Sequence, residues 1–193
     1  TKQVTTRPSA PFITSTLQQA AANQMGFKLR RTMRIAQDLY EGVDIHGAEG
    51  QTGLITYMRT DSTHLAPEAQ QMARQYIEKN FGQDYLPVKP NVFTSSNKSA
   101  QEAHEAIRPT DVLITPDRVR RDLSSDQYKL YQLIWNRFVS CQMKPAQWDS
   151  TTVFIAAHGD EGQGKDSSPA TPKAMFKATG RTLVFDGFYK VTG

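Results

Sequence analysis

Residues 53–65, GLITYMRTDSTHL, place a tyrosine, an arginine and an aspartate at alternate positions, Tyr57, Arg59 and Asp61. If this segment is extended, alternate side chains leave the same face, so the three would lie together. A phenol is a weak nucleophile at neutral pH because its pKa is about 10. A neighbouring guanidinium stabilises the phenolate, and its planar fork matches two phosphate oxygens. The pattern therefore suits attack on a phosphodiester, where an oxygen nucleophile needs donors aimed at the phosphoryl charge.

The same segment contains further polar residues with supporting roles. Asp61 would orient Arg59, while the hydroxyl groups of Thr60, Ser62 and Thr63 would donate to a phosphate backbone. From these residues alone a plainer interpretation is favoured, because Tyr-x-Arg is a common pattern. It is a surface strand followed by the polar start of a helix.

A histidine in QEAHEAIRP is a second candidate for phosphate chemistry. His104 lies between Glu102 and Glu105, and Arg108 follows four residues later, on the same face if the segment is helical. A histidine there would become cationic near a phosphate and would donate a hydrogen bond or carry a proton. The alternative, a solvated histidine in a charged helical turn, is favoured by these residues alone.

A basic cluster predicts an anionic partner. Lys28, Arg30, Arg31 and Arg34 fall within seven residues of a chain whose net charge is +4. A solvated helix face explains one such cluster equally well, but nucleic acid is the commonest partner of this pattern. As a DNA-facing helix, the cluster would contact phosphates, which set affinity and position rather than sequence preference.

The pattern of apolar residues predicts a mainly helical region. A helix is expected from about Ser15, with Ser15 and Gln18 as a capping box, to Gly26; a second helix begins near Arg30 and ends at Gly42. The second is expected to have Leu29, Met33, Ala36 and Tyr40 on one face. Two helices joined by a short Gly-containing turn, the second of them basic, are typical of a helix-turn-helix.

Four further elements are predicted in this region. They are a strand over residues 54–58, a helix from Pro67 to Phe81, a short helix from about residue 100 that Pro109 stops, and a long helix from about Ser125 to Met143. The last is expected to begin at a capping box of Ser124 and Gln127. Its inward face would contain Tyr131, Ile134, Trp135, Phe138 and either Cys141 or Gln142.

After Pro145 the pattern changes to period-two alternation. Residues 148–159, 174–180 and 181–191 are β-rich, and residues 160–173, DEGQGKDSSPATPK, predict a flexible hairpin-like loop. The expected organisation is α+β with several domains. It comprises an extended N-terminal segment over residues 1–12, a helical domain over 13–145 and part of an antiparallel β domain over 146–193. Three strands are few for an independent domain, so we expect sequence outside this chain to complete it.

Several classes of function are not indicated. No apolar run approaches the roughly 20 residues that span a bilayer, and residues 1–12 lack the apolar core of a secretory leader. Because the chain does not begin with methionine, we expect it to be part of a longer protein. Its one cysteine, Cys141, is predicted to be a structural thiol in a reducing, cytoplasmic compartment. No Cys/His cluster has metal-ligand spacing, and no acidic cluster suited to magnesium is recognised.

Longer sequence motifs identify the protein family more specifically than these residue spacings do. APFITSTLQQAA, LYEG, GLITYMRTDST, QEAHEAIRPTDV, LYQLIWNRFVSCQM and DSTT occur in this order. Together they resemble the central region of the bacterial DNA topoisomerase I branch of the type IA topoisomerases, from about residue 8 to 193. Met58 within TYMRTDS is also typical of that branch.

The resemblance implies roles for individual residues. Tyr57 would be the nucleophile that breaks one strand of single-stranded or underwound DNA and leaves a 5′-phosphotyrosine link. Arg59 would contact the scissile phosphate, His104 would assist near it, and Asp61 would have an orienting role. The helical domain would resemble a winged helix that lifts on the β hinge to open a gate in the DNA. Religation would need no ATP.

The same resemblance implies that this chain holds only part of the site. Magnesium would be bound by the acidic residues of a Toprim domain elsewhere in the polypeptide. The partners would be DNA and the remaining domains of the same polypeptide, without a membrane, and the enzyme would be a monomer associated with the nucleoid. DNA contacts are expected from Lys28, Arg30, Arg31, Arg34 and Arg108. The isolated chain is predicted to be inactive.

Two other functions remain open at this stage. A non-catalytic winged-helix-like module would account for the helix-turn-helix and the basic cluster, and predicts binding to duplex DNA. A nuclease or phosphodiesterase using Tyr57 predicts free product ends instead of a covalent adduct.

Overall fold

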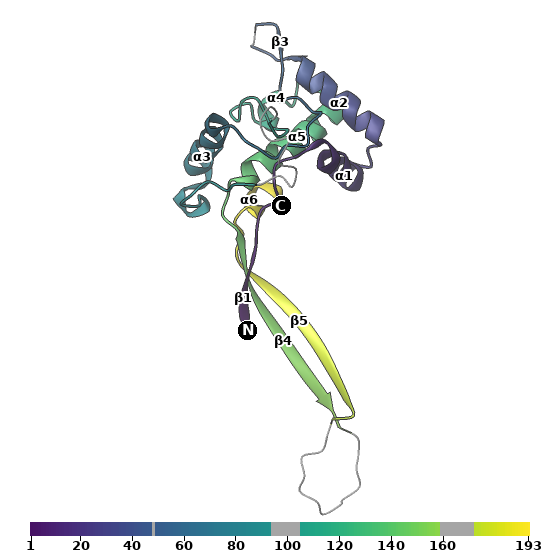
Figure 1. The fold of residues 1–193 in the computed structure, drawn as a ribbon, viewed down its shortest axis with the longest axis vertical. Helices are drawn as coiled ribbons and strands as arrows, with labels where there is room; N and C mark the ends of the chain where they lie inside the picture. Colours follow the sequence, from purple (N-terminus) through teal and green to yellow (C-terminus); the bar gives the residue numbers. More distant parts are fainter. Residues whose placement is uncertain (48, 94–104, 159–171) are drawn as a thin grey trace, which may run out of the picture. The chain divides into compact units, whose positions relative to one another are not determined.

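The structure is a computed structural model that describes residues 1–47, 49–93, 105–158 and 172–193. The chain forms two compact units, shown in Figure 1. One comprises residues 1–6 and 146–186 and is built of strands; the other comprises residues 7–145 and 187–193 and is mainly helical. The protein is therefore a mixture of helices and antiparallel sheet, as the sequence predicts.

The helical unit is organised around one central helix. Its elements are α1 (Thr14–Met25), α2 (Leu29–Glu41), β2 (Val43–Asp44), β3 (Gln51–Thr52), α3 (Pro67–Phe81), the 3-10 helix η1 (Gln83–Tyr85), α4 (Pro116–Val119), α5 (Ser125–Cys141) and α6 (Tyr189–Thr192). The central helix, α5, contacts α1, α2, α3, α4 and α6. Its predicted inward face is confirmed: Tyr131, Ile134, Trp135, Phe138, Cys141 and Gln142 are all buried.

Local sequence signals set several helix ends as predicted. At the start of α5, the Gln127 amide N–H donates to Ser124 Oγ and the Ser124 N–H donates to Gln127 Oε1, a capping box with distances of 3.3 and 3.0 Å. The third helix, α3, begins at Pro67, where a missing N–H costs no helical hydrogen bond. The first, α1, ends at Gly26, whose φ of 67° is left-handed and favours glycine.

Other predictions about the helices are wrong. The first helix begins at Thr14, so Ser15 and Gln18 form no capping box; instead, the Ile13 N–H donates to Thr16 Oγ1 at 3.0 Å. The long helix α5 ends at Cys141, two residues before the predicted end.

The buried face of α2 also differs from the prediction. It comprises Thr32, Ile35, Ala36 and Leu39, because the helix turns this face towards α1 and α5. Of the residues predicted to share one face, Ala36 is buried, whereas Leu29 and Tyr40 are exposed.

The structure describes only the C-terminal part of the short helix predicted around residue 104. Residues 94–104, including His104, lie outside the described residues. Residues 105–109 are extended rather than helical, and Ile107 forms an isolated antiparallel bridge with Phe12. Both of these side chains are fully buried, so packing against the N-terminal segment accounts for the extended conformation.

The strand unit is a three-stranded antiparallel sheet in the order β1-β4-β5. The first strand, β1 (Lys2–Thr6), pairs with β4 (Ala146–Ala157), and β4 pairs with β5 (Ala174–Phe185) from Ala157↔Ala174 to Gln147↔Phe185. Residues 174–180 and 181–185 form one strand, where the sequence suggested two. Most of the predicted loop, residues 160–171, lies outside the described residues.

The boundaries of the units also differ from the predicted ones. The N-terminal segment leaves the sheet after Thr6 instead of at residue 12, because Phe12 is fully buried in the helical unit. Residues 187–193 return to the helical unit, where the Phe188 N–H donates to the Lys144 carbonyl at 3.1 Å.

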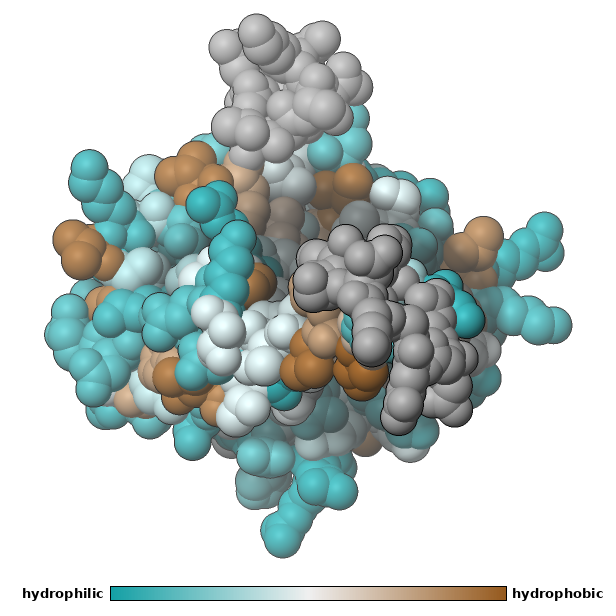
Figure 2. All heavy atoms as spheres, turned by 90° about the horizontal axis from the view of Figure 1, so that it is seen from below, coloured by the Kyte–Doolittle hydropathy of each residue, from teal (hydrophilic) through white to brown (hydrophobic). Residues whose placement is uncertain are grey.

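Apolar side chains remain exposed on the hairpin of β4 and β5. Val153 and Ile155 lie opposite Ala178 and Phe176, so they share one face of the sheet. The larger members of this group are half exposed or more. Figure 2 shows hydrophobic side chains scattered among hydrophilic ones on the face that it draws. Within the described residues, no helix has both the length and the apolar character needed to cross a membrane.

Candidate active site

The segment that contains Tyr57 is not a strand of a sheet, and its backbone bends at Thr56 and Met58. It is held between the end of α2 and residues 106–110: the Leu54 N–H donates to the Leu39 carbonyl at 2.7 Å, and the Thr56 N–H donates to the Arg108 carbonyl at 2.9 Å. Only Ile55 forms a β-bridge, to Pro109. The predicted strand over residues 54–58 is therefore wrong, because its backbone partners lie partly in helix α2 and partly in residues 108–110 instead of forming one ladder.

Side chains nevertheless alternate along this segment as they would in a strand. Met58, Thr60 and Ser62 are buried, whereas Tyr57 is 42% exposed. Arg59 and Asp61 are exposed too. The candidate nucleophile and the candidate phosphate-binding arginine therefore both reach the surface of the helical unit.

Burial changes the interpretation of the two neighbouring hydroxyl groups. Thr60 Oγ1 accepts a hydrogen bond from the Ser62 N–H, and Ser62 Oγ accepts one from the His64 N–H, both at 3.1 Å. These bonds fix the backbone after Arg59. Both residues are buried, which supports a structural role for their side chains. Donation from either hydroxyl to a phosphate stays a prediction.

Thr14, at the start of α1, clamps the backbone on both sides of Arg59. Its hydroxyl accepts a hydrogen bond from the Thr60 N–H at 2.9 Å and lies 2.8 Å from the Met58 carbonyl and 3.0 Å from the Thr60 carbonyl. The Thr14 N–H also donates to the Thr60 carbonyl at 2.9 Å. One side chain, 45 positions away in sequence, thus sets the direction in which Arg59 leaves the chain.

A second tyrosine contacts Tyr57. The ring of Tyr40, near the C-terminal end of α2, lies 5.4 Å from the ring of Tyr57 between centroids, with an interplanar angle of 67°. This is an edge-to-face arrangement. Within the described residues Asp61 forms no ion pair, so the orienting role expected for it has no contact to support it here.

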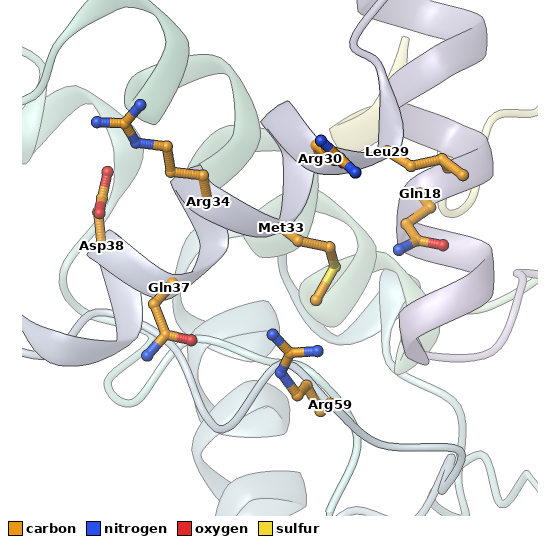
Figure 3. A pocket seen from close by; sticks show the side chains of 8 residues that line it. All are labelled: Gln18, Leu29, Arg30, Met33, Arg34, Gln37, Asp38 and Arg59. Atoms are coloured by element: carbon orange, nitrogen blue, oxygen red, sulfur yellow. The ribbon is translucent and has the colours of Figure 1, made fainter.

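Arg59 opens onto a hollow beside the basic helix. The hollow has a volume of about 570 Å³ and is lined by Gln18, Leu29, Arg30, Met33, Arg34, Gln37, Asp38 and Arg59. Figure 3 shows Arg59 directed towards Met33 and Gln37 on α2, while the guanidinium of Arg34 extends on the other side of the helix, near Asp38. Three arginines therefore contribute to the lining of the hollow, although the guanidinium of Arg34 is directed away from Arg59 (Figure 3). Guanidinium groups beside an open hollow suit a polyanion.

Two of the arginines predicted to bind DNA are engaged within the protein. The guanidinium of Arg31 donates to Asp126 on α5, with Nε at 3.0 Å, and lies 4.6 Å from the ring centroid of Phe27. Arg108 pairs with Glu105 at 2.6 Å and donates to the Pro109 carbonyl, and its side chain is 12% exposed. Both therefore have structural roles in the helical unit. Lys28 is exposed at the N-terminal end of α2.

Cys141 is a structural residue, as expected. It is fully buried on α5, and burial raises the pKa of its thiol to about 12. A thiol held in its protonated form is a poor nucleophile. Tyr131 is also buried, with its hydroxyl donating to the Ile114 carbonyl, and burial raises its pKa. Tyr57, in contrast, is exposed and lies two residues before Arg59, which lines the hollow.

Nothing in the sequence pattern indicates the contacts that Thr14 and Tyr40 make. Thr14 precedes the helix start predicted near Ser15, and Tyr40 is predicted only to share one face of the second helix with Leu29, Met33 and Ala36. Both contact residues 57–60 only because the fold brings α1 and α2 against that segment. Within the described ranges, no group of three or more His, Cys, Asp or Glu side chains is placed to hold a metal ion.

Comparison with known proteins identifies relatives along the whole chain. The family model described as DNA topoisomerase matches residues 1–193. The chain is 51% identical to DNA topoisomerase 1 of Campylobacter jejuni over 186 residues, covering 96% of this chain and 24% of that protein. It is 50% identical to DNA topoisomerase 1 of Vibrio cholerae over 190 residues, covering 98% of this chain and 19% of that protein.

A solved structure agrees with these relatives. Full-length topoisomerase I from Thermotoga maritima superposes with a TM-score of 0.79 at 41% identity, over 99% of this chain and 28% of that one. The chain therefore spans about a quarter of the length of the relatives that it matches. The full-length match of the family model and these identities show that the chain belongs to the DNA topoisomerase family, among the bacterial type I enzymes.

Proposed function

We propose that this chain is the central segment of a type IA DNA topoisomerase and that Tyr57 is its DNA-cleaving nucleophile. The observation that carries the proposal is the joint exposure of Tyr57 and Arg59 on one segment, with Arg59 lining a hollow together with Arg30 and Arg34. The substrate is single-stranded or underwound DNA, and the reaction relaxes negative supercoils.

The cleavage step is a transesterification. The phenolic oxygen of Tyr57 attacks the scissile phosphorus, and the bond from phosphorus to the 3′ oxygen breaks. The phenol loses its proton, and the leaving oxygen gains one to become a 3′-hydroxyl. The product is a 5′-phosphotyrosine diester, so one ester replaces another and nothing is oxidised or reduced. Reversal of the step religates the strand without ATP, because the diester conserves the energy of the broken bond.

Arg59 has the electrostatic role in this step. Its guanidinium contacts the scissile phosphate and stabilises the charge that develops on the non-bridging oxygens. Thr14 holds the two peptide units that flank Arg59, so the guanidinium starts from a fixed backbone. His104 remains a candidate for a donor near the phosphate, since it lies outside the described residues.

The single DNA strand follows the hollow beside α2. Arg30 and Arg34 line this hollow together with Arg59, and Lys28 is exposed at the same end of the helix as Arg30. Such groups would bind phosphates without reading the base sequence. Arg31 and Arg108 are left out of this set because their ion pairs engage them within the protein.

Magnesium chemistry is not assigned to residues of this chain. The acidic Toprim residues that the family resemblance implies would come from another part of the polypeptide. The described residues do not fit such a site, since no acidic group among them is suited to a metal ion. The remaining domains are thus required partners, and the chain alone is expected not to cleave DNA. The winged-helix character of the helical unit, its movement as a gate, and a monomeric state in the cytoplasm belong to the same proposal.

A non-catalytic DNA-binding module is the second candidate. The pair of helices α1 and α2, with a basic second helix, favours it. This module would bind duplex DNA and would form no covalent product. The exposed Tyr57 beside Arg59 would then have no role.

A covalent adduct distinguishes these functions. The full-length polypeptide that carries this segment is incubated with magnesium and a single-stranded oligonucleotide labelled at either end. A 3′ label is expected to stay on the protein in denaturant, and a 5′ label to leave on the shorter fragment. Tyr57→Phe should abolish the adduct. Tyr128 lies on α5, and the control variant Tyr128→Phe should still form the adduct. Free labelled ends without adduct would indicate a nuclease, and an adduct that survives Tyr57→Phe would refute the assignment.

A further inference from the structure

The ring of Tyr40 contacts the ring of the candidate nucleophile without being part of the core. The two centroids are 5.4 Å apart at an interplanar angle of 67°, and the residues Tyr40 and Tyr57 are 40% and 42% exposed. The buried face of α2 consists of other residues, and Tyr40 lies outside it. Burial alone therefore does not explain an aromatic ring at this position.

The backbone beneath the two rings is tightly joined. The carbonyl of Leu39 accepts the Leu54 N–H at 2.7 Å, and a Cβ atom at Gly53 would lie 2.8 Å from the carbonyl oxygen of Tyr40. Only glycine permits this approach. Leu39 and Leu54 are fully buried, so the end of α2 and the segment that carries Tyr57 are fixed to each other.

We propose that Tyr40 is a positioning residue that holds the ring of Tyr57 in the orientation needed for attack. The inference rests on the proposed function. A half-exposed tyrosine rotates among several rotamers, and nucleophilic attack uses only the one that aligns its oxygen with phosphorus. An edge-to-face contact with a ring on a fixed helix end restricts this rotation. The contact uses the aromatic ring of Tyr40 and does not need its hydroxyl group.

Two other roles for Tyr40 make different predictions. As a platform on which a DNA base stacks, it would contribute to DNA affinity and leave the rate at saturating DNA unchanged. As a hydroxyl donor to the substrate, it would lose its effect in Tyr40→Phe. A positioning role predicts that loss of the ring lowers the rate of adduct formation and leaves the DNA affinity unchanged. It also predicts that phenylalanine can substitute for Tyr40 without loss of rate.

The test uses the full-length polypeptide with magnesium and single-stranded oligonucleotide. The rate of adduct formation is measured at saturating DNA for wild type, Tyr40→Phe and Tyr40→Leu. The Kd for the oligonucleotide is measured for each variant in a Tyr57→Phe background, which cannot cleave. Tyr128→Leu is the matched control, because the half-buried Tyr128 contacts Arg120 instead of Tyr57. Thermal unfolding of each variant checks the fold.

Aromatic pairs contribute enough to predict a slowing of roughly two- to twelvefold in Tyr40→Leu, with Kd and unfolding midpoint near those of wild type. Tyr40→Phe should react at nearly the wild-type rate, and Tyr128→Leu should have no effect on it. An unchanged rate in Tyr40→Leu, a raised Kd with a normal rate, or an equal loss in Tyr40→Phe would each overturn the positioning role. A wild-type protein without adduct would instead refute the proposed function, and the role of Tyr40 with it.

Discussion

Replacing Thr14 by valine should destabilise the helical unit and slow the reaction of Tyr57. The substitution keeps the shape of the side chain but removes the hydroxyl that accepts from the Thr60 N–H at 2.9 Å and donates to a carbonyl of Met58 or Thr60. Each net hydrogen bond contributes about 1 kcal/mol, and a buried N–H left without a partner costs more. Thr60 is buried, so we expect a loss of about 2 kcal/mol in the free energy of unfolding.

Equilibrium unfolding of this chain, followed through its helical circular dichroism, measures that loss. For a chain of this size, it corresponds to a fall of about 4–8 °C in Tm. Thr14→Ser keeps the hydroxyl and should lie close to wild type. Thr32→Val is the matched control, since the buried Thr32 hydroxyl only approaches the Lys28 carbonyl at 3.3 Å, which also accepts the Thr32 N–H. If Thr14→Val were no less stable than Thr32→Val, the hydrogen bonds of Thr14 on either side of Arg59 would not contribute to the free energy of unfolding.

Other residues give equally specific outcomes. Arg59→Lys keeps the charge but loses the planar fork, so adduct formation at saturating DNA should fall by about ten- to a hundredfold, and an unchanged rate would contradict the role. Arg30→Gln should weaken binding to single-stranded DNA and lower the slope of log affinity against log salt concentration by about 0.7. Arg31→Gln removes the ion pair with Asp126, so it should change the free energy of unfolding by at most about 1 kcal/mol and leave that slope unchanged. Burial raises the pKa of Cys141 from 9.0 to about 12, so the folded state retains a proton that the unfolded state loses, and stability should decrease as pH rises from about 9 towards 12. In Cys141→Ala this decrease should be smaller; an identical pH profile would contradict it.

Local signals in the sequence predicted the elements that depend on local chemistry. The capping box of Ser124 and Gln127, and Pro67 at the start of α3, act within one helical turn, so they can be recognised without the fold. The inward face of α5 was predictable because bulky apolar residues repeat along it at helical spacing.

The site depended on contacts between distant parts of the chain. Alternation around Tyr57 resembles a strand, but alternation reports only which side chains face the core. Here helix α2 and residues 108–110 supply the hydrogen-bond partners. The roles of Thr14 and Tyr40 arise from packing of α1 and α2 against residues 57–60. Arg31 and Arg30 are adjacent in sequence, yet one pairs with α5 and the other lines the hollow. Charge in the sequence alone does not separate these two.

The identity of the residue bonded to DNA tests the central claim most directly. The adduct formed by the full-length polypeptide with magnesium and a single-stranded oligonucleotide is digested with nuclease and protease. Mass spectrometry then locates the remaining nucleotide on a peptide. We predict a 5′-phosphorylated nucleotide esterified to Tyr57 alone. A nucleotide on any other residue, or a 3′-linked nucleotide, would contradict the account.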